Sequence, residues 1–342
     1  MFIWMGFIAV AGAAAGSSLA RAQAPVMPSS SAPPAANGTA AAQTPAAPPT
    51  PVSPFPPVNL KNFNADFPTT AIVNSFLKEE WGYDEQRLWS VAAIQKTAAP
   101  GVSRVVVYVA NKAQPGKLTD QVFYVTPDQK HAIANGVVDF GANPFVDTRK
   151  TLLAQAHGPA EGAANSDLLV VEFADLLNPK ARDAQDSINK LVKDVPQIRL
   201  VFENLPADGS QYAMRAATEG VCVRKEKGDA AFFTYVQGVF AKLPGMTPGT
   251  LDAGLSTAAT AAGADPKTAM ACAETEAAKD DVKTSVALAA SVNIEQGPEL
   301  VINGRVIPPE SVNYDTLKQI VAYQAKLDGV TVNIQPTLAT IK

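Results

Sequence analysis

The sequence predicts an α/β fold with a long helical insertion, preceded by a smaller α+β domain. Three observations support this prediction. Two continuous apolar runs with an amphipathic segment between them form a βαβ pattern over residues 168–203. An alanine-rich stretch over residues 251–290 has high helix propensity. Upstream, a short helical pattern over residues 70–81 is followed by several runs typical of strands.

Composition limits the classes of function. The chain has 342 residues, of which 47% are hydrophobic and 18% charged, so it can bury one or two ordinary cores. The net charge is −4 and no run of Lys and Arg occurs, so nothing supports a nucleic-acid partner. His131 and His157 are the only histidines, and neither they nor the two cysteines show the close spacing of metal ligands. We therefore predict no metal and no cofactor.

Residues 1–24 have the pattern of a secretory signal peptide. An uncharged apolar stretch is followed by small residues and by an A-x-A cleavage pattern at Ala22–Ala24. The alternative is an uncleaved membrane anchor, because residues 2–20 carry no charge over about the length that a membrane span requires. The predicted location is periplasmic or otherwise exported, with membrane anchoring only in the second case.

Residues 25–60 are predicted to be a disordered linker. Pro, Ala, Ser and Thr dominate this segment up to Pro57, so it cannot pack a core. One interpretation is a semi-rigid spacer on the order of 100 Å long that holds the folded part away from a membrane or wall. The other is a disordered tail without a role.

The first folded segment, residues 61–150, is predicted to contain one helix and a sheet. After the helix over residues 70–81, strands are expected over 88–97, 104–110 and 121–126, and the chain resumes as a strand after the turn at 127–130. Ala99-Pro100-Gly101 and the run from Phe123 to Asp139 resemble the N-terminal domain of periplasmic disulfide isomerases of the DsbC and DsbG type. The resemblance implies a small α+β (cystatin-like) domain that pairs two chains into a homodimer. Gln129 departs from the family by replacing the usual turn glycine.

The second folded segment, residues 151–330, begins its sheet with a buried strand over 168–173. Asn178 suits the N-cap and Pro179 the first turn of the helix that follows. A second buried strand over 198–203 makes a parallel pair with the first. A strand and hairpin turn over 297–305 and an amphipathic helix ending near Leu327 complete the domain, and residues 331–342 form a C-terminal tail.

This order resembles the DsbA-like thioredoxin fold, with its helical insertion at about residues 211–290. The resemblance rests on three segments: Val171–Asp175 before the helix, Leu200–Pro206 after it, and Gly297-Pro298 followed by Leu300–Gly304. It implies that Pro298 is the cis-proline that faces the redox motif. It also implies a peptide-binding groove formed by Asn178, Gly297 and Pro298.

The redox cysteines of that family are missing. At their positions the chain reads Asn178-Pro179-Lys180-Ala181, a degenerate motif without a thiol. A thiolate at a helix N-terminus is the nucleophile of disulfide exchange. Asn can accept the same N–H bonds but cannot attack sulfur, so we predict no catalytic residue. Glu172 matches the buried acid of the family and is interpreted as a vestige of the lost site.

Cys222 and Cys272 lie within the predicted insertion. Two distant cysteines in an exported protein most simply form one structural disulfide, and relatives of this fold carry such a pair in the insertion. The alternative is a reactive pair that exchanges disulfides, although neither cysteine has a CxxC context.

Three functions follow from these observations. The first is a redox-inactive thioredoxin-fold protein of the bacterial cell envelope that binds extended polypeptide or a protein partner, as a chaperone or scaffold would. The second is a thiol-disulfide oxidoreductase or isomerase, which the fold favours and the missing cysteines oppose. The third is a dimeric structural partner of another envelope protein.

Overall fold

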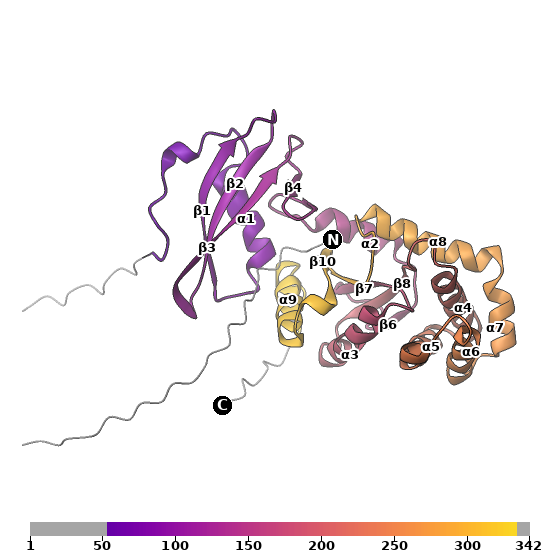
Figure 1. The fold of residues 1–342 in the computed structure, drawn as a ribbon. Coiled ribbons are helices and arrows are strands. Elements are labelled where there is room, and N and C mark those ends of the chain that lie inside the picture. Colours follow the sequence, from indigo (N-terminus) through magenta and orange to yellow (C-terminus); the bar gives the residue numbers. More distant parts are fainter. Residues whose placement is uncertain (1–52, 334–342) are drawn as a thin grey trace, which may run out of the picture. The chain divides into compact units, whose positions relative to one another are not determined.

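The structure, a computed structural model, describes residues 53–333. The predicted signal peptide, most of the predicted linker and residues 334–342 of the predicted tail lie outside these residues. From Phe55 onward the described chain belongs to one compact unit. Figure 1 shows its two sheets, with the N-terminal one in indigo and purple.

The N-terminal part is a helix packed on an antiparallel sheet. A 3-10 helix, η1 (Leu60–Asn62), precedes α1 (Thr70–Trp81). The sheet has the order β1-β2-β3-β4-β5, with β1 (Arg87–Lys96), β2 (Ser103–Asn111), β3 (Gln114–Val125), β4 (His131–Ile133) and β5 (Val137–Asp139). Phe76 and Leu77 of α1 pack against Val105, Val107 and Phe123 of the sheet. The predicted α+β arrangement is therefore confirmed.

One boundary in this sheet differs from the prediction, and one turn has an unusual backbone. Strand β3 begins at Gln114, seven residues before the predicted start, because β2 and β3 extend as a hairpin whose β3 arm is exposed over Gln114–Asp120. An exposed arm has no alternation of apolar and polar residues that would mark it as a strand. Gln129 has a φ of 63°, so it adopts the left-handed conformation that glycine would adopt more easily at this turn.

The second sheet is mixed and has the order β10-β9-β7-β8-β6. Its strands are β6 (Ala160–Gly162), β7 (Leu169–Ala174), β8 (Arg199–Asn204), β9 (Glu299–Ile302) and β10 (Arg305–Ile307). Strands β7 and β8 are parallel, as the βαβ pattern predicts, and the other neighbours are antiparallel. All six residues of β7 are buried, which explains why all of them except Glu172 are apolar.

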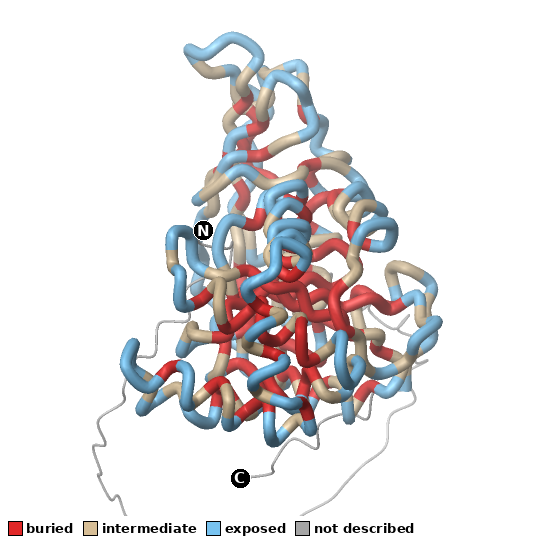
Figure 2. The backbone as a smooth tube through the Cα atoms, turned by 90° about the vertical axis from the view of Figure 1, so that its right-hand side faces the viewer, coloured by how far each residue is buried: buried red, intermediate tan, exposed pale blue. Residues whose placement is uncertain are grey.

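Helices cover both faces of this sheet. Leu152 of α2 (Val146–Gln155) and Leu288 of α8 (Glu276–Ser291) pack with Val171 and Val301 on one side. Helix α3 (Pro179–Asp194) and helix α9 (Tyr314–Leu327) contact each other and bury their apolar stripes, and the short η3 (Pro309–Ser311) contacts α3. Figure 2 shows the buried residues gathered in the interior, with exposed residues around them. The predicted boundary between residues 150 and 151 falls inside α2.

The insertion between β8 and β9 is entirely helical apart from its turns. It contains α4 (Gln211–Lys227), α5 (Asp229–Lys242), η2 (Leu243–Gly245), α6 (Leu251–Ala261), α7 (Pro266–Ala273) and α8. The alanine stripe lets α5 and α6 approach closely, since a Cβ at Gly238 would lie 2.9 Å from the Cβ of Ala258. Within residues 53–333, no helix has the length and apolar character needed to cross a membrane.

Candidate functional site

Asn178 lies at the N-terminus of α3, where the sequence predicts the degenerate redox motif. Its backbone is extended and its Oδ1 accepts a hydrogen bond of 2.9 Å from the backbone N–H of Lys180, so it is the N-cap. Asp175 shapes the preceding loop, because its Oδ1 accepts from the N–H of Leu177 at 2.7 Å and its Oδ2 from the N–H of Ala207 at 3.0 Å. The short polar loop after β7 therefore fixes where the helix begins.

The turn before β9 faces this helix start. The Gly297–Pro298 peptide bond is cis. A Cβ at Gly297 would lie 2.5 Å from the backbone oxygen of Phe173, so the close approach of the turn to β7 requires glycine here. The side-chain Nδ2 of Asn178 donates a hydrogen bond of 3.0 Å to the backbone oxygen of Gly297. The structure thus brings together residues 119 positions apart that the family resemblance places in one site.

No free thiol is available at this site. The chain has two cysteines, and Cys222 of α4 and Cys272 of α7 form a disulfide within the insertion. Ala181, at the position of the second redox cysteine, is fully buried. Lys180 is exposed, and its Nζ lies 3.4 Å from Oε1 of Glu310 on η3, an exposed ion pair that contributes little stability.

We expect the Cys222–Cys272 disulfide to stabilise the fold by restricting the unfolded chain. The bond closes a loop of 50 residues, for which the chain-entropy estimate is about 4 kcal/mol. The variant with both cysteines replaced by alanine should lose that amount of free energy of unfolding in urea denaturation. Thiol titration of the denatured, unreduced wild-type protein should find no free thiol. Two titratable thiols, or a variant as stable as the wild type, would contradict a structural bond.

Glu172 is a buried acid without a hydrogen-bond partner at either carboxyl oxygen among the described residues. It lies in the middle of β7, and burial raises its pKa to about 8, an effect that nearby Gln185 partly offsets. It is therefore mostly protonated at neutral pH. Glu203, on the neighbouring strand, is also buried but accepts from the N–H of His157 and the N–H of Gly158 and from the hydroxyl of Ser285.

Glu299, which directly follows the cis-proline, is a second buried acid that the sequence analysis did not single out. It is 6% exposed, and its Oε2 has no hydrogen-bond partner in the described part of the chain. Burial raises its pKa to about 8, and the nearby carboxylate of Glu310 acts in the same direction. The local sequence does not predict that Glu299 is buried. Its burial follows from the pairing of β9 with β7, in which Glu299 lies opposite Phe173.

A groove of about 730 Å³ lies on the insertion side of this turn. Its walls come from the loop after β8, the start of α4, one side of α8, and the pair Ile294 and Glu295. Glu295 precedes Gly297 by two residues in the sequence. The wall from α8 consists of Lys283, Val286, Ala287 and Ala290, so it is mainly apolar with a charge at its rim. A groove with this lining can accept apolar side chains of an extended chain.

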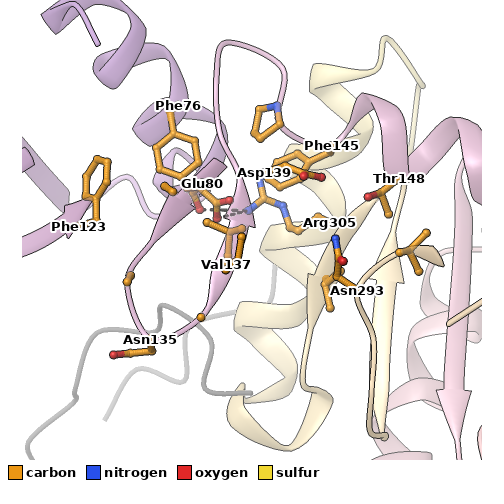
Figure 3. Close-up of a pocket in the computed structure, with 18 residues that line it drawn as sticks. Phe76, Glu80, Phe123, Asn135, Val137, Asp139, Phe145, Thr148, Asn293 and Arg305 are labelled. Carbon is orange, nitrogen blue, oxygen red and sulfur yellow. Dashed lines mark hydrogen bonds and ion pairs between the residues drawn. The ribbon is translucent and has the colours of Figure 1, made fainter. Parts of the chain in front are cut away.

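Arg305 lines a separate cavity of about 110 Å³. Figure 3 shows its side chain among the other residues that line this cavity. Arg305 is buried and donates to the backbone oxygens of Glu79 and Glu80 at the end of α1, and its Nε donates to Gln324. The hydroxyl of Tyr323 donates to the neighbouring carbonyl of Lys78 at 2.7 Å. These donors satisfy the last carbonyls of a helix, so they serve as a C-terminal cap. The sequence offers no local signal for this contact.

Comparison with known proteins decides the family of the second segment. Residues 154–322 match the sequence model of the thioredoxin family. This segment belongs to the thioredoxin family. No curated protein matches the chain. The helical insertion between β8 and β9 agrees with the DsbA-like form of the fold that the sequence predicts.

Several solved structures are similar to this thioredoxin domain. They include a thioredoxin-like oxidoreductase from Silicibacter pomeroyi DSS-3, at 24% identity over 52% of this chain and 98% of that chain, with a TM-score of 0.45. The catalytic domain of Proteus mirabilis ScsC matches at 22% identity over 52% and 98%, with a TM-score of 0.44. BdbD from Bacillus subtilis matches at 25% identity over 49% and 93%, with a TM-score of 0.44. The family match begins at residue 154, so the isomerase-like and cystatin-like character of the N-terminal domain stays a prediction.

Proposed function

We propose that this protein does not exchange disulfides and instead binds extended segments of other polypeptides at its thioredoxin domain. The observation that carries the proposal is Asn178, which stands where the resemblance places the nucleophile, caps the same helix and faces a cis-proline turn. Carbonyl and N–H groups of an exposed turn can pair with an extended peptide without any thiol. The adjacent groove adds an apolar surface for its side chains.

The proposed location is the periplasm or another exported compartment of the cell envelope. Two features support it: the signal-like N-terminal sequence and the Cys222–Cys272 disulfide, since disulfides persist in oxidising compartments. Membrane anchoring would require that the N-terminal segment stay uncleaved.

Peptide binding can be tested on an array of cysteine-free peptides, followed by fluorescence anisotropy with the best binders. We expect binding to the wild-type protein and at least about fivefold weaker binding to A290E, which places a charge on the apolar wall of the groove. A253E, on the exposed side of α6, is the matched control and should bind like the wild type. The absence of binding to any peptide would contradict the proposal.

A second candidate role, as a homodimeric partner protein, is favoured by the face of the N-terminal sheet opposite α1. Tyr124, Ile133 and Val137 lie in register across β3, β4 and β5, and each is at least 40% exposed. An apolar row of this kind is typical of an interaction surface. Light scattering at micromolar concentration should then find a dimer, and V137K, which introduces a charge into the row, should shift it toward monomer. A monomeric wild-type protein would remove this candidate.

A further inference from the structure

The side chain of Asn178 makes two hydrogen bonds with opposite roles. Its Oδ1 accepts from the N–H of Lys180 at 2.9 Å and thereby caps α3. Its Nδ2 donates to the backbone oxygen of Gly297 at 3.0 Å. Asn178 is half-buried, so the second bond lies at the edge of the site and not deep in the core.

The second bond occupies the acceptor that an extended peptide would use. A peptide that pairs with the turn before β9 as an added strand would donate a main-chain N–H to the oxygen of Gly297. In this protein an amide N–H already fills that position from within the chain. An Asn amide is chemically equivalent to a main-chain amide as a donor.

We infer that Asn178 acts as an internal competitor of bound polypeptide: its amide holds the Gly297 oxygen and is displaced when a peptide N–H takes its place. This inference rests on the proposed function and adds the residue that sets affinity at that site. It also defines the chemistry of the partner, which must be an extended chain with a free main-chain N–H at the paired residue. Proline or an N-methylated residue at that position could not displace the amide.

Substitutions at position 178 can remove the bond to Gly297 while they keep the cap of α3. Serine and aspartate are good N-caps and can keep the bond to Lys180, but neither carries the amide donor that reaches Gly297. N178S and N178D should therefore fold with the helix start intact and leave the oxygen of Gly297 free. Asn313 supplies the matched control, because it caps α9 through a 2.9 Å bond from Thr316 and its side chain makes no other hydrogen bond within residues 53–333.

The test measures anisotropy of the best array peptide with wild type, N178S, N178D and N313S, and repeats it with peptides N-methylated at each position in turn. We expect N178S and N178D to bind about fivefold more tightly than the wild type, which corresponds to one net hydrogen bond. N-methylation at the paired position should weaken binding to the wild type and remove the gain of both variants. N313S should bind like the wild type.

Two outcomes overturn the inference in distinguishable ways. If the wild type binds peptide and both folded variants bind equally or more weakly, Asn178 does not compete and only the inference is wrong. The same holds if the gain survives N-methylation at every position. If neither the wild type nor any variant binds a peptide, the proposed function is wrong together with the inference.

Discussion

The double variant N178C/A181C is expected to form an intramolecular disulfide and to gain reductase activity at least about 100-fold above the background of its parent. Positions 178 and 181 are the N-cap and the third residue of α3, a spacing that brings two Cβ atoms close enough to bridge. The helix dipole and Lys180 should lower the pKa of the thiol at position 178. The Asn178–Gly297 bond already shows that this position faces the cis-proline turn.

Insulin reduction and mass spectrometry of the oxidised protein measure this gain. Both single variants serve as controls, because each has one new thiol and cannot close the bridge. If the double variant folds but forms no new disulfide under oxidising conditions, the local backbone is not thioredoxin-like. The alignment of Asn178–Ala181 with the redox motif would then be wrong.

The free energy of unfolding should fall as pH rises from 5 to 8, and E172Q should remove part of this fall. The pKa of Glu172 is about 8 in the folded protein and near 4.5 when unfolded, so unfolding releases a proton throughout this range. The stabilising effect of the raised pKa is complete below pH 4.5 and is lost as pH rises through 8. At 1.36 kcal/mol per pKa unit, Glu172 alone accounts for about 3 kcal/mol between pH 5 and pH 8.

Urea denaturation at several pH values tests this prediction. The stability difference between E172Q and the wild type should widen in favour of the variant as pH rises, since glutamine cannot ionise. Glu299 and Glu219 have pKa values raised in the same direction, so a smaller dependence on pH should persist in E172Q. E85Q, at an exposed position of the N-terminal domain, is the control and should follow the wild type. Parallel curves for E172Q and the wild type would show that folding does not raise the pKa of Glu172.

Local sequence signals predict the elements that position the site. The helix over residues 70–81 has the predicted bounds because Thr69 caps it and its apolar residues recur at helical spacing. The start of α3 follows from Asn178 and Pro179, and β7 and β8 follow from their continuous apolar runs. These signals lie within a few residues of each element, so the elements can be predicted from the sequence alone.

Contacts between distant segments are what the sequence does not predict. The Asn178 amide reaches Gly297 over 119 positions, Ser285 reaches Glu203 over 82, and Arg305 caps α1 over more than 220. Each of these contacts depends on how helices and strands pack together, and such packing leaves no periodic pattern in the sequence. The resemblance to a known family supplied the pairing of Asn178 with Pro298, and the residues alone would not have done so.

The most direct test of the central claim is disulfide turnover by the wild-type protein. Insulin reduction and refolding of scrambled ribonuclease should be measured beside an active disulfide isomerase at equal concentration. The account predicts no turnover above the uncatalysed rate, because the only two cysteines form a disulfide in the insertion and Asn178 occupies the position of the nucleophile. Turnover comparable to that of the isomerase would contradict it.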